Sequence, residues 1–344
     1  MRAPLTVAVV GTPGPSRLTH AFADLPHALI SWFCFEGGSA PRDVFGTAWQ
    51  APSLQTTSDF RRLLEDDDLD AIAFDTDAIA RGSLPAEALA AGKHVFMRGP
   101  LARTVAEADL MVALAEANRR CLRVYHSAAC TSGARRLRDL VQHGGLGELF
   151  YVRATHSGML PADKHLLWDW AADLTALVLD LLGDQPIEVA ARGESYARAD
   201  QFETIVADLR FATGISAQLH ISGVDRREST RISLVGSEAT GLLDSDATRE
   251  LALHRDTNEA WSGQGRRDAS ISYPALPTSE PLRVACESFV AATRSQTNPG
   301  ADRAAAAVVG VLEVMERAAD TGLAAVSRND ADPAEAPVIH LHVQ

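Results

Sequence analysis

The sequence has little that would mark a secreted, zinc-binding or membrane protein. Its four cysteines, Cys34, Cys121, Cys130 and Cys286, contain no C-x-x-C pair, so their spacing indicates neither a zinc site nor a disulfide framework. No apolar run reaches the roughly 18 residues that a membrane-spanning helix needs, and the first eleven residues are typical of a strand and a turn. We therefore expect a protein of the reducing cytoplasm that has no membrane partner and no resident metal.

The chain also lacks an excess of positive charge. Its 344 residues include 32 Lys and Arg against 45 Asp and Glu, which gives a formal net charge of -13. Proteins that bind the phosphate backbone concentrate Lys and Arg in order to displace counterions. A nucleic-acid partner is not expected, and the length allows two domains of an ordinary soluble protein.

The first third of the chain alternates predicted strands with predicted helices. Apolar runs predict strands over residues 5–11, 28–36, 70–76, 94–97 and 122–127. The segments between them carry helical patterns, among them LPAEALAAG and VAEADLMVALAEANRR. This alternation is typical of a doubly wound parallel sheet, so we predict an α/β domain over residues 1–123.

After about residue 127 the predicted strands come in pairs instead. Two alternating runs within residues 202–223 meet at Ala212-Thr213-Gly214, a hairpin signal, and residues 230–244 predict another strand pair. Helices over residues 281–295 and 301–322 and a strand over residues 337–343 close the chain. We predict a second α/β domain over residues 124–344, built on an open and mostly antiparallel sheet.

The stretch from Ala90 to Ala102, AAGKHVFMRGPLA, joins a helix end, a buried strand and a loop without a spare residue. The AGKHV and PLA of this stretch, the glycine turn after the first strand and LVQHGGLGE at residues 140–148 resemble the Gfo/Idh/MocA family of nicotinamide-dependent sugar and polyol oxidoreductases. The likeness covers nearly the whole chain. It implies an N-terminal Rossmann dinucleotide-binding domain, a small-molecule substrate in the cleft between the domains, and a homo-oligomer formed through the C-terminal sheet.

The cofactor-binding residues that the resemblance implies are incomplete. A dinucleotide fold has G-x-G-x-x-G after its first strand, whereas Pro13 and Ser16 stand where this chain would need its second and third glycines. The remaining candidates for cofactor contacts are Gly11, Thr12 and Gly14 in the turn, Glu36 after the second strand and Thr76 after the third. NAD(P) is the implied cofactor, and a tight turn that binds no phosphate stays open as the alternative.

Both catalytic signatures of the family are altered. The Glu-Lys-Pro loop of the family is Arg98-Gly99-Pro100, so residue 99 has no side chain to replace the lysine. Arg98 cannot act as a base, but it can anchor a carboxylate or a phosphate, as can Arg81. The Asp-x-x-x-His of the family corresponds to Asp169 and Asp173, whose spacing of four predicts two carboxylates on one face of a helix. Two such groups in a cleft form an acid and base pair, and a solvated helix face is the alternative.

Four further residues are candidates for substrate contacts. They are His126 after the fifth strand, His156 and His165 in the second domain, and Trp168 beside the two aspartates. For each of them a structural role is the alternative, because single histidines and tryptophans usually pack inside a fold.

Three functions remain open. One is a redox enzyme that binds NAD(P) through an altered loop and works without the family's lysine and histidine. Another is a non-redox enzyme that uses Asp169 and Asp173 as acid and base. The third is a catalytically silent regulator or accessory subunit that binds its ligand without turnover.

Overall fold

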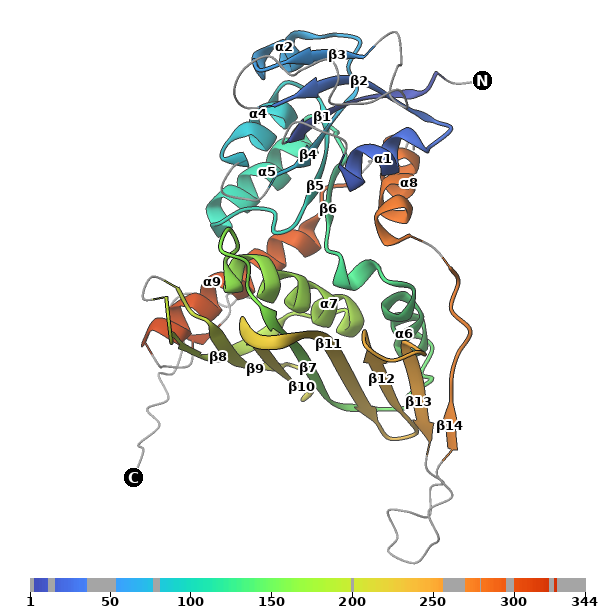
Figure 1. Ribbon diagram of the computed structural model, residues 1–344, viewed down its shortest axis with the longest axis vertical. Helices are drawn as coiled ribbons and strands as arrows, with labels where there is room; N and C mark the ends of the chain where they lie inside the picture. The colour runs from blue at the N-terminus through green and yellow to red at the C-terminus, as the bar shows by residue number, and fades with distance from the viewer. Residues whose placement is uncertain are drawn as a thin grey trace, which may run out of the picture.

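The computed structural model describes residues 3–11, 16–35, 54–76, 81–198, 201–255, 270–278, 280–294, 300–321 and 325–326. Two α/β units are stacked on each other, and the chain passes from the first to the second after β6 (Figure 1). Thr12, Gly14, Glu36 and the predicted strand over residues 337–343 lie outside the described residues.

The first unit is a six-stranded parallel sheet with the order β3-β2-β1-β4-β5-β6. Its strands are β1 (Leu5–Gly11), β2 (Ala28–Cys34), β3 (Gln55–Thr57), β4 (Ala71–Asp75), β5 (His94–Arg98) and β6 (Leu122–Tyr125). Its helices are α1 (Arg17–Ala23), α2 (Arg61–Glu65), α4 (Leu84–Ala90) and α5 (Val105–Ala117). This order confirms the doubly wound Rossmann sheet, in which β1 and β4 flank the point where the winding reverses and ligands are met.

The second unit is a nine-stranded sheet with the order β14-β13-β12-β11-β7-β10-β9-β8-β15. Its strands are β7 (Leu149–Met159), β8 (Pro186–Glu194), β9 (Thr204–Phe211), β10 (Ser216–Ser222), β11 (Val224–Gly236), β12 (Thr240–Asp244), β13 (Leu251–Arg255), β14 (Ser270–Ser272) and β15 (Ala325–Val326). Among these described strands, β7 and β10 are the one neighbouring pair that runs parallel, so the prediction of a mostly antiparallel sheet is confirmed. The predicted hairpin is β9–β10, and its Gly214 has the positive φ of 88° that the turn requires.

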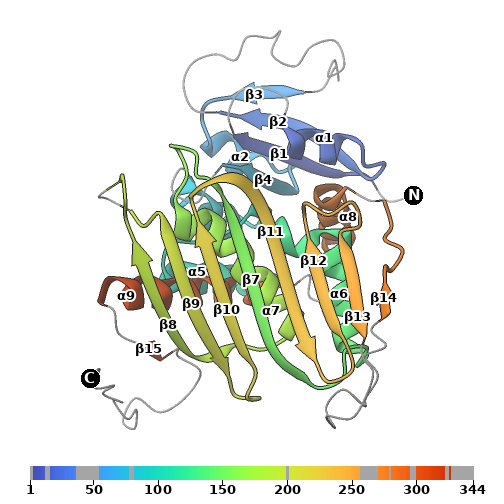
Figure 2. The ribbon, with the colours of Figure 1, turned by 60° about the horizontal axis from the view of Figure 1, so that its bottom comes forward.

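Helices cover one face of this second sheet (Figure 2). They are η3 (Ala128–Cys130), α6 (Ser132–Gln142), η4 (Leu166–Ala171), α7 (Ala172–Leu182) and α9 (Arg303–Thr321), whereas α8 (Pro281–Thr293) packs on the first unit. Helix α7 is buried on nearly all sides because it packs between the sheet and α9. Buried and exposed residues alternate along β9, so the other face of the sheet is bare.

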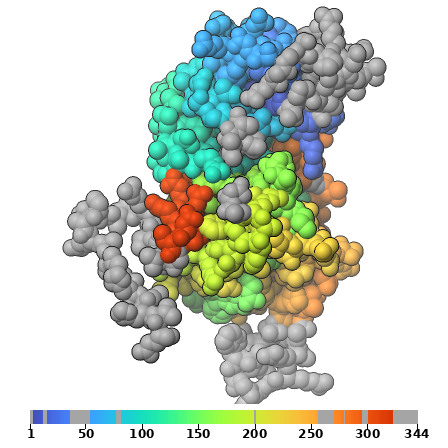
Figure 3. Space-filling view, turned by 60° about the vertical axis from the view of Figure 1, so that its left-hand side comes forward, coloured from blue at the N-terminus to red at the C-terminus, as the bar shows by residue number. Residues whose placement is uncertain are grey.

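The two units share their packing at two places. Helix α9 lies below α5, and the Val105 amide of α5 donates to Glu313 Oε1 of α9 at 2.7 Å. Figure 3 shows the red end of α9 at the junction of the two units. Helix α8 packs on the first unit although it comes late in the chain, with the Phe289 ring 5.4 Å from that of Phe96. The division between residues 123 and 124 stays a prediction, since β6 of the first sheet ends at Tyr125.

No helix within the described residues has both the length and the apolar character needed to span a bilayer.

His94 is a buried polar group at the start of β5. Its Nδ1 accepts a hydrogen bond from the Cys121 amide at 2.8 Å, which ties the start of β5 to the segment entering β6. Burial lowers the pKa of His94 to about 4, and the charge of Arg120 lowers it further than the charge of Asp70 restores it. His94 is therefore neutral in the folded protein at neutral pH.

We expect His94 to make the fold sensitive to mild acid. The folded pKa of about 4 lies below the unfolded value of 6.5, so the unfolded chain takes up the proton first and stability falls as the pH decreases through this window. The shift corresponds to a decrease of about 3 kcal/mol in the free energy of unfolding once the pH has fallen to the folded pKa. About 2 kcal/mol of this decrease is reached by pH 5. Urea unfolding at pH 7 and pH 5 should show this extra loss for the wild type but not for His94→Asn, whose amide oxygen keeps the hydrogen bond. Equal losses in the two proteins would contradict this role.

Candidate functional site

The ends of β5 and β6 lie side by side and bring distant residues together. Arg98 pairs with Tyr125 in the parallel register, and the Gly99 amide donates to the Tyr125 carbonyl at 2.9 Å. Because the strands run in the same direction, the residues that follow, Gly99 and His126, also become neighbours.

The imidazole of His126 packs directly on Gly99. A Cβ atom added at residue 99 would overlap the Cε1, Nδ1 and Nε2 atoms of the ring. The His126 side chain is only 8% exposed. The side chain that fills the space beside the Arg98-Gly99-Pro100 loop is therefore an imidazole from the neighbouring strand.

Asp173, in the first turn of α7, is bonded to both residues that follow β6. One carboxylate oxygen lies 3.2 Å from His126 Nδ1, and the other accepts a hydrogen bond from Ser127 Oγ at 2.5 Å. Burial by itself raises the pKa of Asp173, but the hydrogen bond and charge of His126, the charge of Arg98 and the Ser127 hydroxyl outweigh it and hold the pKa below its usual value. Asp173 is therefore ionised at neutral pH.

Two adjoining pockets open on this cluster. The first, here called the cleft pocket, has a volume of about 370 Å³ and the second, the strand-end pocket, about 310 Å³. Polar residues that line the cleft pocket include Arg98, Tyr125, Ser127, Asp173, His156, Glu228, Thr230 and Glu250. The strand-end pocket is lined by Arg17, Leu18, Asp75, Phe96, Arg98, Tyr125, Ser127 and Leu282. Since Arg98, Tyr125 and Ser127 line both, a ligand in one pocket lies next to a ligand in the other.

The far wall of the cleft pocket is aromatic. The rings of His156 on β7 and Trp170 in η4 lie 4.5 Å apart at an angle of 87°, and His156 Nδ1 is 2.7 Å from Thr230 Oγ1. Burial lowers the pKa of His156, and burial raises the pKa of Tyr125 beyond its ordinary value. The cleft pocket therefore offers a neutral imidazole and a protonated phenol beside the ionised Asp173.

Arg81 shapes this site from inside the protein. It is 2% exposed, and its guanidinium donates to the carbonyls of Thr76 at 2.8 Å, Arg98 at 2.7 Å and Pro100 at 2.5 Å. These bonds fix the end of β4 to the loop that follows β5. The sequence-based expectation that Arg81 can anchor an anionic ligand is therefore wrong, because backbone carbonyls occupy its donors.

We expect Arg81→Met to lower the free energy of unfolding by about 3 kcal/mol, because three buried carbonyls lose a charged donor. Denaturant unfolding measures this loss. Arg62→Gln, a change of an exposed arginine in α2, is the matched control and should change stability by less than about 0.5 kcal/mol. A similar loss in both variants would show that the Arg81 hydrogen bonds contribute little.

Asp169, His165 and Trp168 are among the predicted site residues that line neither pocket. Asp169 accepts from the His165 amide at 2.8 Å and lies 3.6 Å from Lys164 Nζ. Residues 166–171 form a π-helical turn, so the spacing of four between Asp169 and Asp173 does not act as it would in a regular α-helix. Trp168 is 2% exposed, donates to Glu316 at 2.9 Å and stacks on Arg103. The indole that reaches the cleft pocket is that of Trp170.

The end of the first sheet where the sequence predicts cofactor contacts lies at β1 and β4. Gly11 permits close packing there, since a Cβ atom on it would lie 3.2 Å from the Asp75 Cβ. Ser16 caps α1 by accepting from the Thr19 amide at 3.1 Å. Burial raises the pKa of Asp75, opposed by a hydrogen bond from Ser16 and by the charge of Arg98. The cofactor contacts proposed for Gly11 and Thr76 stay predictions.

No three His, Cys, Asp or Glu side chains of the described segments gather in the way that a metal ion would require. The site residues that sequence reasoning missed come from several elements, namely Arg17, Tyr125, Glu228, Thr230 and Glu250. The place of Tyr125 at the site could have been predicted, because this residue ends the strand next to β5. The two glutamates had none, since they lie in β11 and just before β13, where no local motif marks them.

Comparison with known proteins agrees with this architecture. A family model described as "Oxidoreductase family, NAD-binding Rossmann fold" matches residues 5–126, and one described as "GFO/IDH/MocA C-terminal domain" matches residues 134–241. A 1,5-anhydro-D-fructose reductase of Ensifer adhaerens is 25% identical over 203 residues, 54% of this chain and 60% of that protein. The uncharacterized oxidoreductase YdgJ of Escherichia coli K12 is 33% identical over 146 residues, 42% of this chain and 37% of its own. The match thus spans less than two thirds of either relative.

Solved structures show the same fold along most of the chain. A levoglucosan dehydrogenase in complex with NADH and levoglucosan has a TM-score of 0.76 at 16% identity, covering 95% of this chain and 100% of that one. GenD2 from gentamicin A biosynthesis, in complex with NAD, has a TM-score of 0.76 at 21% identity, covering 96% and 98%. The fold defines a two-domain protein with an NAD-binding type of Rossmann domain. The chain belongs to the Gfo/Idh/MocA oxidoreductase family.

Proposed function

We propose that the protein is an NAD(P)-dependent oxidoreductase that acts on a small polar molecule in the cleft pocket without the lysine and histidine pair of its family. One observation carries the proposal: the His126 imidazole fills the space beside Gly99 and holds Asp173, which stands where the family has its histidine. The acid–base groups are thus replaced rather than simply deleted, which favours a working site over an eroded one.

Asp173 is the base in this arrangement. When a substrate alcohol is oxidised, its hydroxyl proton must leave, and the Ser127 hydroxyl can accept it while passing its own proton to Asp173 over 2.5 Å. His126 fixes the orientation of the carboxylate from the other side. Arg98 lines the same pocket and supplies positive charge beside the oxygen that loses the proton.

The strand-end pocket is the proposed site for the nicotinamide end of the cofactor. Gly11 ends β1 beside the start of α1, Arg17 and Arg98 offer positive charge for phosphates, and Phe96 and Leu18 offer an apolar wall. Among the described residues that line this pocket, Asp75 is the acidic one and opposes an anion, although burial favours its neutral form by raising its pKa. When bound, the cofactor would supply the hydride-accepting ring, and the residues named here would hold and orient it.

A catalytically silent ligand-binding protein is the second candidate. It is favoured by the Asp75 carboxylate, which hydrogen-bonds to Ser16 at the start of α1, where a Rossmann domain meets phosphates. The acid–base enzyme that pairs Asp169 with Asp173 gains no such support, because Asp169 is bonded to His165 and Lys164 outside the cleft pocket.

The bare face of the second sheet is the proposed contact between copies of the chain. Tyr151 on β7, Val206 on β9 and Val224 on β11 are large apolar side chains exposed on the sheet strands. Exposed apolar groups of this kind favour association between copies of the chain.

We place the protein in the cytoplasm, which agrees with the four free cysteines.

Fluorescence titration with NADH and with NADPH tests the proposed function. We expect one of them to bind with a micromolar Kd, together with turnover of a polyol or carbonyl substrate. Absence of binding at millimolar cofactor would reject the redox enzyme and leave the silent binder. Tight binding with no turnover across a broad panel of polyols and carbonyl compounds would likewise favour the silent binder.

A further inference from the structure

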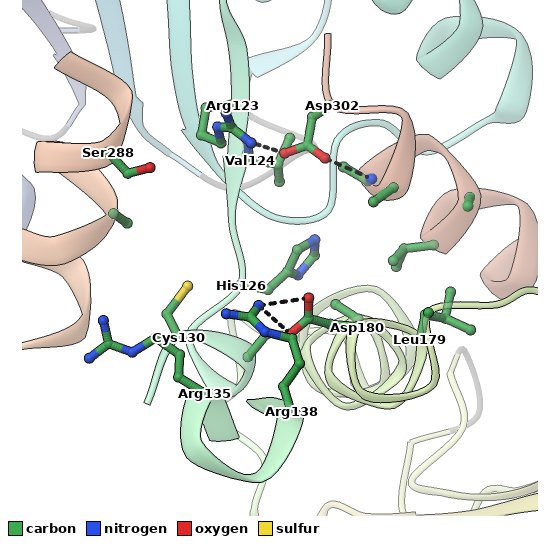
Figure 4. A pocket seen from close by; sticks show the side chains of 18 of the residues that line it. Arg123, Val124, His126, Cys130, Arg135, Arg138, Leu179, Asp180, Ser288 and Asp302 are labelled. Atoms are coloured by element: carbon green, nitrogen blue, oxygen red, sulfur yellow. Dashed lines mark hydrogen bonds and ion pairs between the residues drawn. The ribbon is translucent and has the colours of Figure 1, made fainter. Parts of the chain in front are cut away.

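A third cavity, here called the rear cavity, lies behind the segment that links the two units. Its volume is about 750 Å³, roughly twice that of the cleft pocket and within the usual range for small-molecule sites. Helices α6, α7, α8 and α9 surround it (Figure 4). No residue of the proposed catalytic mechanism other than His126 lines it.

The rear cavity and the cleft pocket share two walls. In the linking segment, His126, Ala129 and Cys130 line the rear cavity, whereas Ser127, Ala128 and Thr131 line the cleft pocket. Helix α7 is divided in the same way, with Asp173, Leu174 and Leu177 on the cleft side and Ala176, Leu179 and Asp180 on the rear side. The two spaces therefore lie back to back.

Several charged groups that line the rear cavity already have partners. Arg138 is bound to Asp180 through two contacts of 3.0 and 2.9 Å, and the Asp302 carboxylate accepts the amides of Val124 at 3.0 Å and Ala305 at 3.1 Å. Arg123 differs, because its buried Nε has no hydrogen-bond partner in the described part of the chain. A buried guanidinium donor without an acceptor calls for an anion.

His126 presents a second polar atom without a partner. Its Nδ1 is held by Asp173, while Nε2 is buried and has no hydrogen-bond partner among the residues that the structure describes. The residue as a whole is only 7% exposed. Figure 4 shows its ring extending into the rear cavity, between the Arg138–Asp180 pair and Asp302.

Much of the remaining lining is aliphatic, although Gln142, Gln185 and Ser288 also border the rear cavity. Side chains from four elements supply the aliphatic part, among them Val124, Ala176, Leu179, Val284 and Val308. We propose that the rear cavity is a second small-molecule site, which takes an organic carboxylate with a short aliphatic body. The carboxylate binds at Arg123, and the aliphatic body packs on the helices and against the His126 ring. Because the same imidazole orients Asp173, occupancy of this site acts on the cleft pocket.

Isothermal titration of the full chain with butyrate and succinate tests this site, with butyramide as the uncharged probe. We expect millimolar or tighter binding of a carboxylate and none of the amide. Arg123→Gln should weaken binding at least tenfold, which is about 1.4 kcal/mol. Arg136→Gln, an exposed arginine of the same helix that carries Arg135 and Arg138, should bind as the wild type does. In ¹⁵N spectra, the His126 imidazole signals, assigned with His126→Asn, should shift on binding.

These measurements require neither cofactor nor turnover, so they stand apart from the test of the proposed function. No binding at tens of millimolar carboxylate, equal binding of butyramide, or full binding by Arg123→Gln would overturn the proposal. Ser288→Phe provides a second variant if Arg123→Gln does not fold, because Ser288 is exposed on α8 and its side chain points into the rear cavity (Figure 4). Undiminished binding by Ser288→Phe would overturn the proposal as well.

Discussion

Asp173→Asn is expected to lower kcat/KM by about a thousandfold, since general base catalysis contributes about 10² to 10⁴. Asparagine has nearly the same shape as aspartate and can still accept the Ser127 hydrogen bond, but it cannot take the proton. Asp169→Asn is the matched control, four residues earlier, and should leave kcat/KM close to that of the wild type because Asp169 lies outside the cleft pocket. Steady-state rates with the substrate found in the screen measure both variants.

The controls separate a chemical role of Asp173 from a structural one. Thermal unfolding should show that Asp173→Asn remains folded, and NAD(P)H binding should change little because the carboxylate does not line the strand-end pocket. Equal losses in Asp169→Asn and Asp173→Asn would instead favour the enzyme that uses both carboxylates. Full activity of Asp173→Asn would refute the proposed base.

The fold was readable from the sequence because its signals are local. Strands buried on both faces appear as continuous apolar runs, and the one over residues 5–11 coincides with β1. The end of α4 was marked by Gly92, which has the expected positive φ of 76°. Strand β3 was missed because it is an edge strand of three residues, Gln55–Thr57, with mostly exposed polar side chains. It carries no apolar run to detect.

The site was only partly readable because its decisive contacts are not local. Gly99 showed that a side chain is absent, but the residue that fills its place comes from a neighbouring strand and lies 27 positions later. The register of two parallel strands sets that contact, and no spacing motif encodes it. The interpretation of Asp169 and Asp173 assumed a regular α-helix, whereas the π-helical turn over residues 166–171 breaks that period.

Gly99→Ala is expected to lower the free energy of unfolding by about 2 kcal/mol, within the usual range for overpacking. The new Cβ would occupy the volume of the His126 ring, so the ring must move and its contact with Asp173 is lost. Gly310→Ala is the matched control: it lies inside α9, and its Cβ would meet only Val105 Cγ2 at 3.9 Å. That change should be neutral or stabilising by up to about 1 kcal/mol, as expected when alanine replaces glycine within a helix.

A double-mutant cycle tests whether His126 has taken the place of a side chain at residue 99. Gly99→Lys and His126→Ala should each destabilise the protein, the first by overlap with the ring and the second by leaving a void. Combined, they should cost at least about 1 kcal/mol less than the sum of the single changes, because the alanine makes room for the lysine. Denaturant unfolding of the four proteins measures this coupling. Additive losses would mean that the two residues do not compete for one space. Strong coupling with restored NAD(P)-linked turnover would show that an imidazole after β6 and a lysine after β5 are alternative ways to complete this cleft.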